Sequence, residues 1–127
     1  MTSTPATDNS SGSSLSALRN AKRNARLATL GEGVRRVLAA HPGGEVWLFG
    51  SLARGDWDAY SDVDLLAIAP SPAQAEALAD ALLGARLGDD VVPLSQSRWR
   101  QLRESDDPHW RAIGRDALEL TSTLLTA

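Results

Sequence analysis

Hydrophobic positions between residues 27 and 38 repeat with the spacing of an α-helix. Five apolar side chains fall on one helical face: Leu27, Leu30, Val34, Val37 and Leu38. Gly31 and Gly33 interrupt this face, each at a cost of about 1 kcal/mol relative to alanine. The pattern therefore predicts either one weakened helix or two helices that meet near Gly31. The run from His41 to Gly44 predicts the end of this helical stretch.

Three short apolar runs bounded by turn residues predict β-strands over 45–49, 62–69 and 90–94. Pro93 cannot donate a hydrogen bond to a neighbouring strand, so the third strand is predicted at a sheet edge. Residues 52–60 are polar and predict a short helical turn followed by a loop.

Helical segments alternate with these strands. Helices are predicted over 73–87 with Gly88 as the cap, over 98–104 after an N-cap at Ser97, and from Pro108 toward Leu125 with a break at Gly114. Short strands separated by helices predict a small α/β or α+β domain, a short sheet flanked by helices.

Composition sets the outer limits of the protein class. The chain has 127 residues, of which 43% are apolar and 23% charged, which is ordinary for one globular domain. Residues 1–14 are almost entirely small or polar and predict a disordered tail, so the expected domain spans 15–127. There is no cysteine, which excludes disulfides and zinc–thiolate sites. No signal peptide or apolar stretch of membrane-spanning length is visible, so the cytoplasm is the expected compartment.

The distribution of charge gives a hint about partners. A net charge of -3 argues against a general nucleic-acid binder. Six basic residues nevertheless lie between Arg19 and Arg36, against the single acid Glu32. This segment is either a solvated helix face or a surface for an acidic partner or RNA. His41 and His109 each stand beside a proline and are interpreted as capping or exposed residues.

Asp62 and Asp64 begin the second predicted strand. Side chains two positions apart on a strand point to the same face, so the two carboxylates are expected about 6 to 7 Å apart. At an effective dielectric constant of about 20, their repulsion is roughly 2.5 kcal/mol. A divalent cation such as Mg²⁺ would reverse the sign of this interaction. Two such ions would suit phosphoryl or nucleotidyl transfer.

Gly50 and Ser51 follow the first predicted strand where a helix would begin. Glycine permits close approach of a ligand to the backbone, and free backbone N–H groups at such a position favour phosphate. Arg54, one turn further, offers a guanidinium fork that matches phosphate geometry. The alternative for Arg54 is an ion pair with Asp56 or Asp58.

A third carboxylate would complete a catalytic site. Asp90 directly precedes the apolar residues of the third strand and is the preferred candidate, with the role of general base. Asp89 is the alternative.

The segment 48–68 resembles a known family. Gly50-Ser51, ten residues, and then Asp62-Val63-Asp64 resembles the GS-x10-DxD signature of the DNA polymerase β-like nucleotidyltransferases. LFGSLARGD and SDVDLL resemble the minimal nucleotidyltransferases more closely, and AIGRDALEL at 112–120 resembles their usual ending. The resemblance extends over roughly residues 27 to 120.

This resemblance implies a fold, a reaction and a partner. The fold would be a mixed sheet of three or four strands with helices on one side. Asp62, Asp64 and Asp90 would bind two Mg²⁺ ions, and Gly50 and Ser51 would hold the triphosphate. The enzyme would transfer AMP from ATP to a hydroxyl. Many minimal nucleotidyltransferases are antitoxins that adenylylate a tyrosine of a HEPN-domain toxin.

Two other functions stay open at this stage. One is a binding module that neutralises its partner by occlusion alone, although such a module has no need for a repelling pair of aspartates. The other is a nucleotidyltransferase acting on a small molecule or an RNA end. Enzymes of that kind usually hold the acceptor with a second domain, for which the chain has no length.

Overall fold

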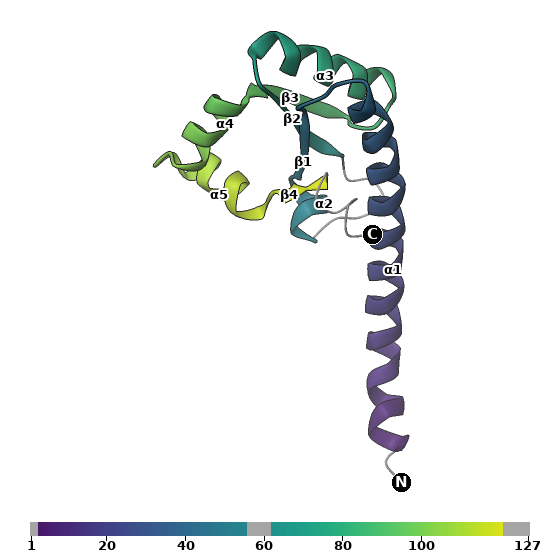
Figure 1. Cartoon of the computed structure of the whole chain (residues 1–127). Helices are drawn as coiled ribbons and strands as arrows, with labels where there is room; N and C mark the ends of the chain where they lie inside the picture. Colours follow the sequence, from purple (N-terminus) through teal and green to yellow (C-terminus); the bar gives the residue numbers. More distant parts are fainter. Residues whose placement is uncertain (1–2, 56–61, 121–127) are drawn as a thin grey trace.

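The computed structural model describes residues 3–55 and 62–120, with side chains described from residue 15 onward. Its elements, in chain order, are α1 (Ser3–Ala39), β1 (Glu45–Phe49), α2 (Ser51–Arg54), β2 (Asp64–Ala69), α3 (Pro72–Gly84), β3 (Asp90–Ser95), α4 (Gln96–Arg103), α5 (Pro108–Asp116) and β4 (Leu118–Glu119) (Figure 1). The three strands predicted from the sequence are therefore confirmed, with the start of the second moved to Asp64.

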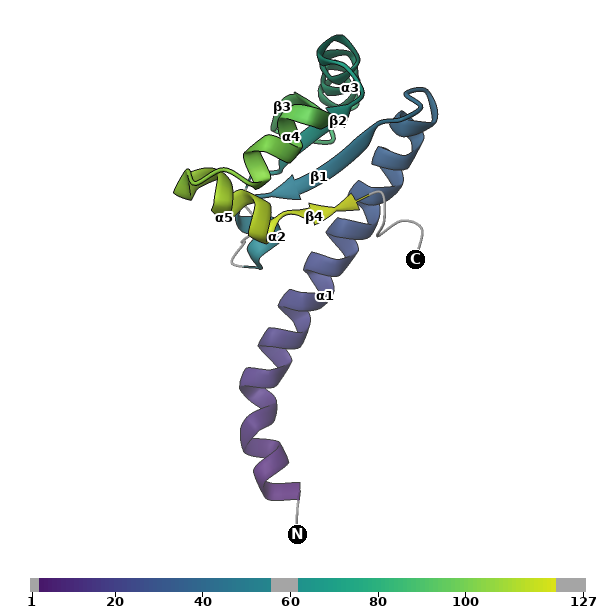
Figure 2. The ribbon, with the colours of Figure 1, turned by 60° about the vertical axis from the view of Figure 1, so that its left-hand side comes forward.

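The strands form one mixed sheet in the order β3-β2-β1-β4. β1 is antiparallel to both β2 and β4, whereas β2 and β3 are parallel (Figure 2). The register aligns Phe49 with Asp64 and Asp64 with Asp90, so the end of β1 meets the beginnings of β2 and β3. β3 is an edge strand, as Pro93 predicts.

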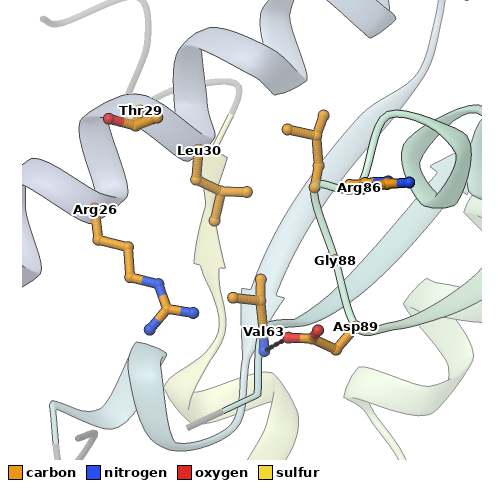
Figure 3. Close-up of a pocket in the computed structure, with 8 residues that line it drawn as sticks. Arg26, Thr29, Leu30, Val63, Arg86, Gly88 and Asp89 are labelled. Atoms are coloured by element: carbon orange, nitrogen blue, oxygen red, sulfur yellow. Dashed lines mark hydrogen bonds between the residues drawn. The ribbon is translucent and has the colours of Figure 1, made fainter. Parts of the chain in front are cut away.

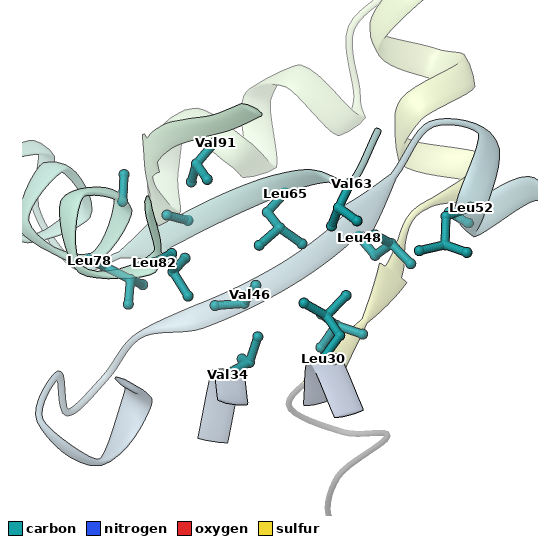
Figure 4. Packing of buried hydrophobic residues seen from close by; sticks show 14 residues of the cluster. Leu30, Val34, Val46, Leu48, Leu52, Val63, Leu65, Leu78, Leu82 and Val91 are labelled. Carbon is teal, nitrogen blue, oxygen red and sulfur yellow. The ribbon is translucent and has the colours of Figure 1, made fainter. Parts of the chain in front are cut away.

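One face of the sheet packs against α1 and α3. Alternate strand residues, such as Val46, Leu48 and Leu65, are fully buried there against Val34 of α1 and Leu78 of α3 (Figure 4). This is the face that the helical spacing of residues 27–38 predicts for the inner side of α1.

The opposite face is covered by α4 and α5. Leu66 and Ile68 are buried there against Trp99, and the ring centroids of Trp47 and Trp99 lie 5.6 Å apart. The guanidinium of Arg103 lies 5.1 Å from the ring centroid of Trp47. The predicted mixed sheet flanked by helices is therefore confirmed, whereas the helices cover both faces and not the one side that the resemblance implies. Both faces of β2 are apolar, and each must be covered.

α1 is a single helix that continues through Gly31 and Gly33. A Cβ atom at Gly33 would lie 2.4 Å from Cδ2 of Leu87, so the missing side chain lets α1 approach the segment that leads into β3. The helix also includes residues 3–14, where the sequence predicts a disordered tail. Adding a turn to an existing helix avoids the cost of nucleation. Figures 1 and 2 show this N-terminal half of α1 extending beyond the sheet.

Helix boundaries differ from the sequence predictions at two caps. Ser95, rather than Ser97, caps α4, because its hydroxyl accepts a hydrogen bond from the Arg98 N–H at 3.2 Å. α3 is capped at Ala85 rather than Gly88. Gly88 instead permits a close contact, since a Cβ there would lie 2.9 Å from Cδ1 of Leu65.

The C-terminal helix is shorter than predicted. α5 ends at Asp116 and is followed by the two-residue strand β4, which pairs with β1. The predicted continuation over 121–125 lies outside the described residues. Within the described part of the chain, no helix is long and apolar enough to cross a membrane.

Candidate active site

Asp64 and Asp90 lie side by side at the starts of two parallel strands. They are the first residues of β2 and β3 and are aligned in the register. Neighbouring strands run about 4.8 Å apart, which brings the two carboxylates close together. Side-chain alternation gives Asp64 the same face as Leu66, the face that α4 and α5 cover. The sequence predicts Asp90 as the third carboxylate beside Asp62 and Asp64, and the parallel alignment of β2 and β3 puts it directly next to Asp64.

Asp62 precedes β2 instead of belonging to it. It is exposed, while Val63, the next residue, is buried on the α1 side of the sheet. Asp62 is still close enough for its charge to raise the pKa of Asp64. Among the residues that the structure describes, no three carboxylate or imidazole groups converge into a complete metal site. The arrangement is thus a close pair of aspartates with a third carboxylate nearby.

Asp89 has a structural role in this arrangement. Its Oδ2 atom accepts a hydrogen bond from the backbone N–H of Val63 at 2.7 Å (Figure 3). The N–H groups of Asp89 and Asp90 donate to the carbonyl of Val63 at 2.8 and 3.2 Å. These three bonds join the beginnings of β2 and β3. Since the Asp89 carboxylate is engaged on the backbone, the geometry favours Asp90 over Asp89 as the partner of Asp64.

Gly50 brings the backbone against the Asp64 carboxylate. Its φ angle is 82°, in the region that favours glycine, and a Cβ atom there would lie 2.5 Å from Oδ2 of Asp64. Ser51 begins α2 directly afterwards and is half-buried. Gly50 and Ser51 thus lie at the end of β1, where the sequence predicts a phosphate-binding turn.

A residue of α1 holds α2 in place. Nε of Arg23 donates to the carbonyl of Leu52 at 3.0 Å, and a terminal nitrogen of Arg23 donates to the carbonyl of Ala53 at 3.1 Å. A cation is favourable at these C-terminal carbonyls. Part of the basic character of α1 is therefore explained by support of the turn that follows Gly50. The sequence interpretation of a solvated face or partner surface missed this role.

Arg54 lies at the end of α2, close to the aspartates. It is exposed, and its positive charge lowers the pKa of Asp64. This position is compatible with the predicted phosphate contact. Asp56 and Asp58, the alternative ion-pair partners, lie outside the described residues.

Asp64 is an electrostatically unfavourable place for a negative charge. Burial is the largest cause of its raised pKa, followed by the charges of Asp90, Asp62 and Asp89, while Arg54 acts in the opposite direction. Such a concentration of carboxylates, only partly offset, attracts cations. Oxygen donors of this kind are the ligands that Mg²⁺ prefers.

A cavity of about 220 Å³ adjoins this group. Its lining combines the end of β1 and α2 with one face of α5: Phe49, Gly50, Arg54, His109, Ala112, Ile113 and Asp116. The α5 residues recur at helical spacing, three, four and seven positions after His109, which is the signal that the sequence offered. His109, which the sequence predicts as a capping or exposed residue, is exposed and also lines this cavity.

The sequence matches the family model "Nucleotidyltransferase domain" over residues 31–107, more than half of the chain. The chain therefore belongs to the nucleotidyltransferase domain family. The match includes β1, the glycine turn, β2, β3 and α4.

Solved structures share the fold. An inferred nucleotidyltransferase from Sulfolobus solfataricus superposes with a TM-score of 0.51 at 20% identity, covering 80% of this chain and 84% of that one. A toxin–antitoxin protein determined with AMP-PNP gives a TM-score of 0.47 at 22% identity, covering 71% of each chain. The first similarity supports the nucleotidyltransferase fold, and the second is too remote to support more. No curated protein matches the sequence.

Two glycines that share a positive φ but differ in ψ, which is -159° at Gly50 and 1° at Gly55, test the role of the Gly50 turn. Gly50→Ala adds a methyl group against Asp64 at backbone angles that are essentially restricted to glycine, so we expect the free energy of unfolding to fall by more than the roughly 1–2 kcal/mol that a left-handed helical conformation alone costs. Gly55 has a φ of 89° and a ψ of 1°, and among the described residues no atom lies within 4 Å of its added Cβ, so Gly55→Ala gives the cost of a left-handed helical conformation without a clash. Urea unfolding of both variants measures the difference. Equal losses in the two would contradict the close approach of Gly50 to Asp64.

The raised pKa of Asp64 determines how the stability of the metal-free protein changes with pH. Because the folded protein holds this proton more tightly than the unfolded chain, ionised Asp64 destabilises the fold, and this penalty disappears as pH falls through the folded pKa to below about 3.8. Asp64→Asn should therefore raise the melting temperature at pH 7 in EDTA. The gain over wild type should shrink as the pH is lowered toward 4. A variant that is less stable than wild type at pH 7 would contradict this assignment.

Proposed function

We propose that this protein is a Mg²⁺-dependent nucleotidyltransferase that moves AMP from ATP to a hydroxyl group of a HEPN-type toxin and so acts as an antitoxin. The observation that carries the catalytic part is the alignment of Asp64 with Asp90, together with the approach of the Gly50 backbone to Asp64. Membership of the nucleotidyltransferase domain family supports the same class of reaction.

The reaction assigns a role to each residue. Asp90 accepts the proton of the attacking hydroxyl. The hydroxyl oxygen then forms a bond to the α-phosphorus of ATP, while the bond from that phosphorus to the bridging oxygen breaks and pyrophosphate leaves. Gly50 and Ser51 hold the triphosphate, and Arg54 supplies positive charge next to it. AMP ends on the acceptor oxygen.

The residues present fit the metal that the family implies. Asp64 and Asp90 supply hard oxygen ligands from adjacent strands, and Asp62 is the third candidate ligand. Bound Mg²⁺ would neutralise the phosphate charge and polarise the reacting oxygens. Asp90 is preferred to Asp89 in this set because one oxygen of the Asp89 carboxylate accepts a hydrogen bond from the Val63 N–H.

The finer parts of the proposal rest on the sequence resemblance. LFGSLARGD and SDVDLL resemble the minimal nucleotidyltransferases, many of which are paired with HEPN toxins, and this supports ATP as the donor and a toxin hydroxyl as the acceptor. The role of α1 also bears on the partner. Leu15 and Leu18 expose 70% and 53% of their surface on the part of α1 that extends from the domain, which offers apolar contact area for another protein.

One observation favours a binding-only antitoxin as the second candidate. Asp62 lies outside β2, and no complete three-ligand site forms among the described residues. A protein that only occludes its partner would not require the third ligand to converge.

Transfer of labelled AMP separates the two candidates. The protein is mixed with α-labelled ATP, Mg²⁺ and the product of the neighbouring gene, and label on that product is quantified. Asp64→Asn and Asp90→Asn should each reduce labelling at least 100-fold, because each removes a carboxylate from the reacting centre.

Asp80→Asn is the matched control, since Asp80 is exposed on α3, on the side of the sheet away from Asp64. It should retain full labelling. Undiminished labelling by Asp64→Asn would refute the catalytic assignment. Inhibition of the neighbouring protein without any labelling would establish the binding-only alternative.

A further inference from the structure

Apart from Gly50 and Arg54, the residues that line the cavity beside Gly50 have no role in the proposed reaction. One wall is the end of β1 with Phe49 and Gly50, and another is the face of α5 that carries His109, Ile113 and Asp116. The start of α5 is fixed by Asp107, whose carboxylate accepts a hydrogen bond from the His109 N–H at 2.9 Å. Ile113 also packs in the core beneath α4 and α5, so this wall is anchored to the sheet.

The lining divides into an apolar and a polar part. Phe49, Ala112 and Ile113 offer flat or small apolar contacts, whereas Arg54, His109 and Asp116 offer charge and hydrogen bonds. Asp116 is half-buried and pairs with Nε of its neighbour Arg115 at 3.2 Å, which leaves carboxylate lone pairs for further donors. A ligand for this cavity therefore carries both apolar carbon surface and hydroxyl donors.

The volume and charge of the cavity indicate which part of a nucleotide it can hold. The volume of about 220 Å³ is below the range of about 300–1,000 Å³ typical for whole drug-sized ligands, so the cavity holds one ring of a nucleotide rather than all of it. A phosphate group in this part of the cavity would be repelled by the carboxylate of Asp116 and would lie against mostly apolar side chains. A sugar ring meets neither objection, because its hydroxyls donate to a carboxylate and its carbon face packs on apolar side chains.

We infer that this cavity binds the ribose of the donor nucleotide, with the Asp116 carboxylate accepting hydrogen bonds from the ribose hydroxyls and His109 lining the entrance. The inference rests on the proposed function, because it requires the phosphates of ATP to lie at Gly50 and Arg54, in the same cavity wall. It assigns α5 the task of distinguishing ribonucleotides from nucleotides without ribose hydroxyls.

Binding of three probes in Mg²⁺ tests this assignment: ATP, 2′,3′-dideoxy-ATP and tripolyphosphate. The wild type should bind ATP about tenfold more tightly than the dideoxy analogue, as expected for hydrogen bonds to a charged acceptor. In Asp116→Asn, this ratio should fall to within about twofold, while affinity for tripolyphosphate stays unchanged. Asp106→Asn, an exposed aspartate just before α5, should keep the tenfold ratio.

The two histidines give a second readout. The sequence contains only His41 and His109, so imidazole NMR signals report on one residue in the cavity and one on the far end of β1. ATP should shift the His109 signals and leave those of His41 unchanged. His109→Gln and His41→Gln assign the two sets of signals.

The outcomes separate this inference from the proposed function. If ATP binds and AMP is transferred, but the dideoxy analogue binds equally well or the His109 signals do not move, the ribose assignment is wrong and the transferase stands. If neither ATP nor tripolyphosphate binds in the presence of Mg²⁺, the proposed function and the ribose assignment both fail.

Discussion

The candidate site depends on the hydrogen-bonded junction between the beginnings of β2 and β3. The Val63 N–H donates to the Asp89 carboxylate, and the Val63 carbonyl accepts from the N–H groups of Asp89 and Asp90. Each bond contributes about 1 kcal/mol, but their main effect is to fix the register. A shift by one residue would turn Asp64 or Asp90 to the opposite face, into the core beneath α1 and α3. Because both faces of the sheet are covered by apolar side chains, the observed register, in which Asp64 lies beside Asp90, is the favoured one.

This junction gathers charge that the fold alone does not need. Burial and three neighbouring carboxylates raise the pKa of Asp64, and the backbone of Gly50 closes on its Oδ2 atom. The arrangement is consistent with a protein that sacrifices some stability for a cation and a phosphate at one place. The support is distributed: Arg23 of α1 holds the turn after Gly50, and α5 forms a wall of the adjoining cavity.

Sequence patterns predicted the strands well because each is a short apolar run between turn residues. The edge position of β3 followed from Pro93, and Gly50 stood out at the end of such a run. Helix ends were predicted less well. Ser95 and Ser97 are equally good caps by residue type, and only the path of the chain selects Ser95. Helices on the second face were missed because the resemblance implied one covered side, although Leu66 and Ile68 are apolar there.

Contacts between segments that are distant in the chain could not be predicted from the sequence. Nothing local distinguishes Arg23 from the other basic residues of α1, or His109 from a capping residue.

The most direct test of this site assignment is a crystal structure with Mn²⁺ and a non-hydrolysable ATP analogue, with anomalous scattering used to locate the metal. We predict anomalous density in contact with the carboxylates of Asp64 and Asp90, and phosphates at Gly50 and Ser51. Metal bound elsewhere, or an analogue bound away from Gly50, would contradict it.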